Sequence, residues 1–155
     1  MIHSKAIIYE KYGTPLFVDE IKVGDPKPYE VVLKMYASGI CGSQLMNLNN
    51  SKSANPEILG HEGTGVVMKA GKNVAHVKEG DQVLISWMPY GADENTEYLE
   101  WCESVEWKGE NLKTLIFTWA EHTIMHSQFV SKLDSKKGAK WGHLACVDCI
   151  NLISF

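Results

Sequence analysis

The stretch Ile58-Leu59-Gly60-His61-Glu62-Gly63-Thr64-Gly65-Val66-Val67 decides how this chain folds. It places an imidazole and a carboxylate side by side at the start of an apolar run that is typical of a β-strand, and its glycines space the backbone around them. Taken alone, His61 is more often a buried histidine hydrogen-bonded to the backbone than a metal ligand. A ligand role needs a second donor, such as a thiol, from another part of the chain.

Strand-like runs separated by turns flank this stretch on both sides. Their β-branched residues alternate with polar ones, and turns such as Gly13-Thr14-Pro15 and Gly24-Asp25-Pro26 separate them. The runs are residues 5–10, 16–21, 30–36, 60–69, 82–88, 114–118, 120–126 and 129–133. Helix is scarce, with one or two turns expected at 45–50 and a helix-compatible segment at 139–151. The pattern predicts a mainly β domain, either a barrel or a sandwich.

Residues 91–109 differ from these runs because acidic side chains are interleaved there with aromatic ones. Acidic residues usually form a solvated face, and their order in this segment does not suggest a metal cage. We therefore expect an exposed excursion or hairpin in this part of the chain.

Composition excludes several classes of function. The chain has 155 residues, of which 45% are hydrophobic, so it can form one compact domain with a real core. A formal net charge of −4 with dispersed basic residues predicts no nucleic-acid partner. No apolar run approaches the roughly 20 residues that span a bilayer, and the first residues lack the apolar block of a signal peptide. We expect no membrane association and a cytoplasmic location.

The chain has four cysteines, at positions 41, 102, 146 and 149. In a reducing compartment these thiols are better suited to metal binding, catalysis or packing than to two disulfides. Cys146 and Cys149 could form a redox pair, but no βαβ pattern of the thioredoxin kind surrounds them. Cys41 lies between glycines after an apolar run, which leaves its surroundings open.

Three segments together resemble a known family. Residues 39–45, the stretch 58–67, and residues 71–83 with their Gly80-Asp81 turn resemble the zinc-dependent alcohol dehydrogenases of the medium-chain dehydrogenase/reductase superfamily. The resemblance covers residues 1–149. It implies a GroES-like, partly open antiparallel β-barrel with a few short helices, which in the family is normally followed by a Rossmann domain. Residues 150–155 diverge from the family and form a tail.

The resemblance also implies residue roles. Cys41, His61 and Cys149 would bind Zn²⁺, with water or substrate oxygen in the fourth tetrahedral position, as in the two-cysteine, one-histidine catalytic zinc site of alcohol dehydrogenase. Whether Cys146 or Cys149 is the third ligand stays open. Ser43 would relay the substrate proton, although a hydroxyl there could instead cap the following helix. Glu62 would be an acid beside the metal, or an alternate ligand.

The sequence departs from the family at several positions. Gln44 stands where an aspartate usually orients the ligand histidine, and Met46 replaces a frequent relay histidine. Cys102 alone cannot build the family's second zinc site, which needs four cysteines, so we interpret Cys102 as a packing or surface residue. No strand, glycine-rich turn and helix of the dinucleotide-binding kind is present.

These features lead to three hypotheses. The first is the catalytic domain of an alcohol dehydrogenase-like oxidoreductase that acts on small alcohols or aldehydes, inactive alone because NAD(P) would require a Rossmann domain from another chain. The second is a non-catalytic zinc-binding or partner-binding module, and the third is a zinc-free relative whose thiols pack. Apolar surface left uncovered would favour self-association or a partner chain. Trp87, Phe117 and Trp119 would line a substrate pocket or belong to the core.

Overall fold

The computed structural model describes residues 1–50, 56–87, 89 and 101–133. These residues form a mainly β fold, which confirms the predicted fold class. The strands are β1 (Ile2–Tyr9), β2 (Phe17–Val23), β3 (Glu30–Ser38), β4 (Glu57–Ile58), β5 (Gly63–Ala70), β6 (Gln82–Ile85), β7 (Cys102–Trp107), β8 (Glu110–Thr114), β9 (His122–His126) and β10 (Val130–Lys132). The helices are α1 (Gly42–Leu48) and a 3-10 turn, η1 (Ser127–Phe129).

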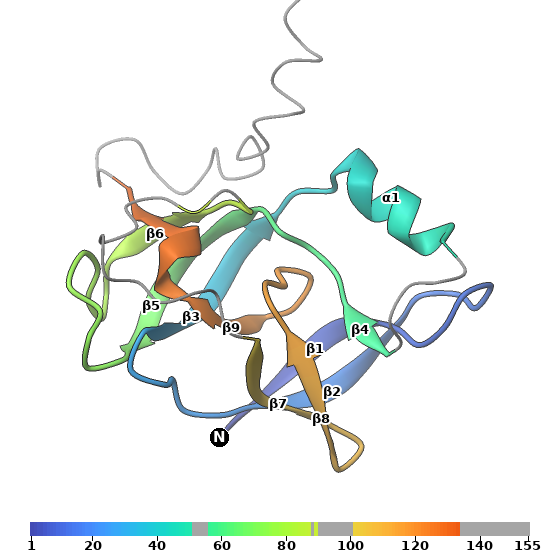
Figure 1. Ribbon diagram of the computed structural model, residues 1–155, viewed down its shortest axis with the longest axis horizontal. Helices are drawn as coiled ribbons and strands as arrows, with labels where there is room; N and C mark the ends of the chain where they lie inside the picture. The colour runs from blue at the N-terminus through green and yellow to red at the C-terminus, as the bar shows by residue number, and fades with distance from the viewer. Residues whose placement is uncertain (51–55, 88, 90–100, 134–155) are drawn as a thin grey trace, which may run out of the picture.

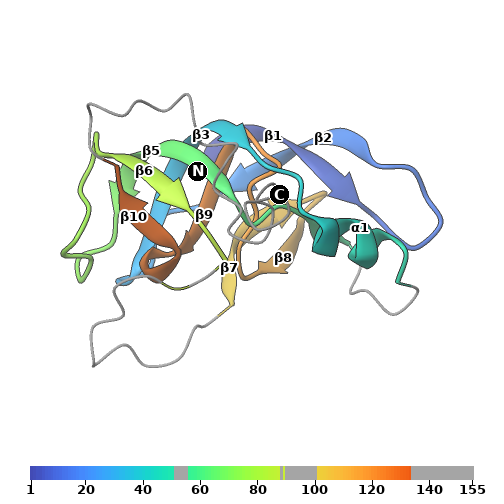
Figure 2. The ribbon, with the colours of Figure 1, turned by 90° about the horizontal axis from the view of Figure 1, so that it is seen from above.

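The strands form two five-stranded antiparallel sheets. One has the order β4-β1-β2-β7-β8, and the other has the order β10-β6-β5-β3-β9. Helix α1 follows β3 and extends beyond the strands at the end of the molecule where β4 lies (Figure 1). Figure 2 shows the same arrangement from above, with α1 at the end of the molecule away from β6 and β10.

A short segment before β9 joins the two sheets. Trp119 O accepts the backbone N–H of Ile7 at 2.8 Å, and Glu121 N donates to Lys5 O at 2.9 Å, so this segment pairs with β1. On its other side, Met35 N of β3 donates to Glu121 O at 2.9 Å. These bonds close one side of the barrel, because backbone pairing now runs from β1 through this segment to β3.

Two apolar clusters fill the interior. The first lies between the sheets and includes Ile8, Val32, Cys102 and Ile124, each 0% exposed. The second lies under β5, β6 and β10 and includes Leu33, Met125 and Phe129. Strands such as β2 alternate inward apolar residues with outward polar ones, which is the period-2 pattern that the sequence predicted. Strands β3 and β9 are instead buried on both faces, because their consecutive residues pack into different clusters.

Most predicted strand runs match strands of the structure within a few residues, but the run at 114–118 was wrong. Strand β8 ends at Thr114, and the following residues cross the barrel as an irregular connection. Phe117 is 0% exposed and belongs to the core, so the apolar run reflects burial of a loop and not a strand. The helix at 45–50 was predicted a few residues late, since α1 spans Gly42–Leu48.

The exposed segment expected at 91–109 needs correction where the structure describes it. Strand β7 buries Cys102, Val105 and Trp107, and it forms a hairpin with β8 through Lys108 and Gly109, whose φ angles are +51° and +86°. The acidic residues hid this alternation because they occupy the outward positions. Residues 90–100 and the helix-compatible segment at 139–151 lie outside the described residues, as does the domain boundary at 149.

None of the helices in the described ranges has the length and apolarity needed to cross a bilayer.

Candidate metal centre

The peptide that carries His61 lies between β4 and β5, and backbone hydrogen bonds from the loop before β9 hold it in place. Leu59 O accepts two backbone N–H groups, from Thr118 at 3.2 Å and from Trp119 at 3.0 Å. Gly60 has a φ of +99°, and a Cβ there would lie 2.3 Å from Thr118 Oγ1 and 2.7 Å from Trp119 N. Glycine is required at this position because both the backbone angle and the space exclude a side chain.

The backbone of Glu62 is held by the end of β3. Its carbonyl oxygen accepts the N–H of Gly39 at 3.1 Å and the hydroxyls of Ser38 at 3.1 Å and Thr118 at 3.0 Å. The Glu62 side chain is 1% exposed, and a Cβ on Gly39 would approach its Oε2 to 2.8 Å. Trp119 Nε1 donates to Gly39 O at 3.0 Å. Glycine at position 39 therefore permits a buried carboxylate to lie against the backbone.

Cys41 begins α1. It is the N-cap residue, with extended φ and ψ of −94° and 149°, and it is 6% exposed. Gln44 Oε1 accepts the Cys41 backbone N–H at 3.0 Å, which fixes the first turn as a capping-box contact does. Ser43 Oγ donates to Cys41 Sγ at 3.4 Å. The helix-capping interpretation of Ser43 is thus wrong, since Cys41 occupies the cap and the Ser43 hydroxyl points to the thiol.

These elements bring three potential metal ligands together. Cys41 Sγ, one His61 ring nitrogen and one Glu62 carboxylate oxygen lie within 4.8 Å of one another. His61 Nε2 and Glu62 Oε1 are 3.2 Å apart. Ligands of a tetrahedral zinc at about 2.0–2.3 Å lie roughly 3.3–3.8 Å from one another. The donor set therefore fits one zinc ion after only a small contraction.

Buried polar atoms at this site lack a hydrogen-bond partner within the described part of the chain. Gln44 Nε2 is one, and Glu62 Oε1, which lies 3.2 Å from His61 Nε2, is another; the two residues are 2% and 1% exposed. An unsatisfied buried polar group costs about 1–3 kcal/mol, so such atoms are uncommon unless a bound group completes the site. A cation beside Glu62 would satisfy its oxygen.

Some of the other predicted residues lie outside the part of the chain that the structure describes, and the rest can be placed. Cys149 and Cys146 lie outside the described residues, so the third thiol ligand has no structural description. Met46 is 73% exposed on α1, and Trp87 is 45% exposed at the end of β6. Cys102 is 0% exposed in the core, and burial raises the pKa of its thiol, with the Glu30 carboxylate adding to the effect. The packing role of Cys102 is confirmed.

Sequence reasoning missed two residues whose hydroxyls bind the backbone carbonyl of Glu62. Ser38 and Thr118 lie 80 positions apart, yet their hydroxyls are 2.7 Å from each other and both contact Glu62 O. No local motif signals this pairing. The single available signal was a threonine within an apolar run, which indicates a buried hydroxyl that needs a partner.

The alcohol dehydrogenase GroES-like domain matches residues 27–135, which is more than half of the chain. The chain belongs to this family. The match covers β3, α1, β5 and the loop before β9, which are the elements that build the candidate metal centre. Membership confirms the family that the motifs at 39–45 and 58–67 predicted.

Individual proteins with a similar sequence are also alcohol dehydrogenases. "Alcohol dehydrogenase 6" of Peromyscus maniculatus is 46% identical over 98 residues, covering 62% of this chain and 26% of the relative. "Alcohol dehydrogenase" of Moraxella sp. (strain TAE123) is 32% identical over 133 residues, covering 81% and 38%. The chain thus spans between about a quarter and two fifths of the length of these relatives.

Solved structures show the same fold. Benzyl alcohol dehydrogenase from Acinetobacter calcoaceticus has a TM-score of 0.75 at 20% identity, over 99% of this chain and 49% of that one. An alcohol dehydrogenase zinc-binding domain protein from Burkholderia ambifaria has a TM-score of 0.74 at 22% identity, over 87% and 43%. At these identities the likeness establishes the fold, and it confirms the predicted GroES-like barrel.

Proposed function

We propose that this chain is the zinc-binding catalytic domain of an alcohol dehydrogenase-like oxidoreductase. Cys41 and His61 hold the metal, and Cys149 is the third protein ligand. The observation that supports this most strongly is the convergence of Cys41, His61 and Glu62 within 4.8 Å in a domain of this family. A thiolate, an imidazole and an open position are the donor set of catalytic zinc rather than of calcium or magnesium.

The chain's own residues prepare the site for an alcohol or aldehyde oxygen. Zinc would supply Lewis acidity toward that oxygen. Ser43 Oγ, 3.4 Å from Cys41 Sγ, is placed to accept or return the hydroxyl proton of a substrate bound beside the thiol. Glu62, buried and with Oε1 3.2 Å from His61 Nε2, is an acid beside the metal and offers an alternate ligand oxygen.

Zinc affinity tests the ligand set. We expect one zinc per chain, and Cys41→Ala should weaken binding by more than about 100-fold, because even outer contacts to zinc ligands are worth about 10- to 100-fold. Cys149→Ala should act like Cys41→Ala, while Cys146→Ala and the buried-core control Cys102→Ala should leave the affinity unchanged. The measurement is competition against a chromogenic chelator, with circular dichroism to check folding.

Other outcomes of the same titration would reassign the site. Strong loss in Cys146→Ala with none in Cys149→Ala would make Cys146 the third ligand. Loss in Glu62→Gln as large as in Cys41→Ala, with both tail cysteines neutral, would make Glu62 the ligand. A folded, metal-replete sample without zinc would reject the proposal and favour the zinc-free relative.

We propose further that this domain acts with NAD(P) only together with a nicotinamide-binding domain. The 155 residues contain no dinucleotide-binding motif, and hydride transfer requires the reacting carbons at about 3–3.5 Å. Calorimetric titration of zinc-loaded chain with NAD and NADP should give no saturable heat, and an alcohol-dependent assay at the nicotinamide absorbance should give no turnover. Cofactor binding, or turnover that Cys41→Ala removes, would establish an active enzyme instead.

The alternative is a zinc-binding or partner-binding module without catalysis. Both proposals share the zinc site. They are separated by complementation: a supplied nicotinamide-binding domain should restore turnover for the catalytic domain and should not for the module.

We propose a cytoplasmic location for the protein, and we propose self-association or a partner chain over its uncovered apolar surface.

A further inference from the structure

A groove lies between β1 and β2 on one side and β3 on the other. Its volume is about 890 Å³, within the range of roughly 300–1,000 Å³ that is usual for ligand pockets. Its floor is the segment that joins β1 to β3, and its walls come from β1, β2 and β3. Cys41, His61 and Glu62 do not line it.

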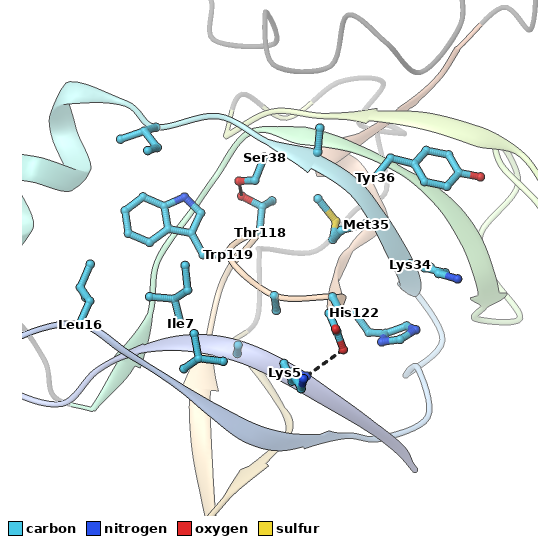
Figure 3. A pocket seen from close by; sticks show the side chains of 16 residues that line it. Lys5, Ile7, Leu16, Lys34, Met35, Tyr36, Ser38, Thr118, Trp119 and His122 are labelled. Carbon is cyan, nitrogen blue, oxygen red and sulfur yellow. Dashed lines mark hydrogen bonds between the residues drawn. The ribbon is translucent and has the colours of Figure 1, made fainter.

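The groove has an apolar end and a charged end (Figure 3). Ile7, Leu16 and Trp119 gather at one end. Lys5, Lys34 and His122 gather at the other. Val18 and Ile40 also line the groove and are 64% and 68% exposed, so its apolar surface is open to solvent. An exposed apolar surface beside gathered charges is characteristic of a binding site for an amphipathic molecule.

The charged end carries a net positive charge. Among residues 1–50, 56–87 and 101–133, neither the Lys5 nor the Lys34 ammonium forms an ion pair. Glu121 is the carboxylate in this part of the groove, and its Oε2 accepts the Lys5 backbone N–H at 3.2 Å. Burial lowers the pKa of His122. The Glu121 carboxylate raises this pKa and the Lys34 ammonium lowers it further, and the net lowering favours the neutral imidazole. Two cations and one anion therefore face the groove.

We propose that this groove binds an amphipathic organic anion, with its carboxylate between Lys5 and Lys34 and its apolar body over Ile7, Leu16 and Trp119. The charge of the polar end selects an acid over an alcohol or an amine. The groove suits a flexible medium-length chain, because its volume of about 890 Å³ is open to solvent along the exposed Val18 and Ile40. This site is independent of the proposed zinc function, since its lining residues bind no metal.

The test is NMR titration of the full chain with decanoate, decanol and decylamine, each below its micellar concentration. Decanoate should shift the Trp119 indole N–H and the backbone amides of residues 118–122. Decanol should bind a few-fold more weakly, and decylamine should produce no saturable shift. Octanoate should bind up to about fifteenfold more weakly than decanoate, since each buried methylene is worth about fourfold.

Matched variants locate the two ends. Lys34→Gln and Lys5→Gln should each weaken decanoate binding about two- to fivefold, the range for exposed charge pairs, and leave decanol unchanged. Leu16→Ser should weaken both ligands. Lys72→Gln, an exposed lysine outside the groove, is the control and should change neither. Binding should persist in Cys41→Ala, which separates this site from the zinc proposal.

Three results would overturn the inference. The first is decanoate affinity that does not respond to Lys5→Gln or Lys34→Gln. The second is equal binding of all three head groups, which would indicate a general apolar surface. The third is absence of ligand binding together with a concentration-dependent dimer that Leu16→Ser dissociates, because a second copy of the chain would then be the occupant.

Discussion

Replacing Gly60 by alanine should destabilise the protein more than the same change at Gly13, Gly80 or Gly109, which also have positive φ angles but open space around them. Its φ of +99° costs a side-chain-bearing residue about 1–3 kcal/mol. The new Cβ would also lie 2.3 Å from Thr118 Oγ1 and 2.7 Å from the backbone N of Trp119. Because Trp119 N already donates to Leu59 O, the backbone cannot move away freely, and overpacking adds about 1–3 kcal/mol.

Gly80 provides the matched control. Its φ is +85°, and a Cβ there would meet no atom within 4 Å. Gly80→Ala should therefore show the backbone strain without the collision. Urea unfolding followed by circular dichroism should give a loss for Gly60→Ala that exceeds the loss for Gly80→Ala by about 1–3 kcal/mol.

The same substitution should weaken zinc binding, because Gly60 precedes His61 and any shift of the backbone moves the imidazole. Competition against a chromogenic chelator measures this, with Gly80→Ala unchanged. If the two variants unfold with free energies within about 0.5 kcal/mol of each other, the loop that carries Thr118 does not hold the His61 peptide as the structure indicates.

The contacts around the site and in the core allow three further tests. Thr118→Val removes one hydroxyl from Glu62 O and should cost about 0.5–1.5 kcal/mol in urea unfolding; no measurable change would mean that Ser38 alone suffices. Cys102 should resist alkylation in the native chain at mildly alkaline pH, because burial raises the pKa of its thiol, and mass mapping that finds it labelled before unfolding would contradict this. Burial lowers the folded-state pKa of His122, so the unfolded chain takes up this proton first as the pH falls. That contribution to stability is present above about pH 6.5 and is lost below it. In His122→Gln this part of the pH dependence should disappear from urea titrations, and an unchanged profile would refute the assignment.

Local patterns in the sequence predicted a mainly β domain, either a barrel or a sandwich, and the family resemblance predicted the barrel. The alternating run at 16–21 marked β2, and the glycine spacing around His61 and Glu62 marked the start of β5. These signals are local because a strand's faces repeat every two residues. The run at 114–118 misled because a buried loop also needs apolar residues, and the acidic hairpin at 101–109 misled because its charges occupy the outward positions.

The candidate site was only partly accessible from the sequence. Cys41 and His61 stand in recognisable motifs, and the structure brings them together with Glu62. The support from Ser38, Thr118 and Trp119 depends on contacts between residues 24 to 80 positions apart, which no motif encodes. Gln44 could be identified as a departure, but its contact with the Cys41 backbone is a consequence of how α1 starts.

X-ray absorption spectroscopy at the zinc edge tests the central claim most directly. It identifies the atoms bound to the metal and their distances, and it can be recorded on the full chain. We predict four-coordinate zinc with two sulfur atoms at about 2.3 Å and two nitrogen or oxygen atoms at about 2.0–2.1 Å, and one sulfur lost in Cys41→Ala. A spectrum with nitrogen and oxygen ligands alone, or one that Cys41→Ala leaves unchanged, would contradict the proposed zinc centre.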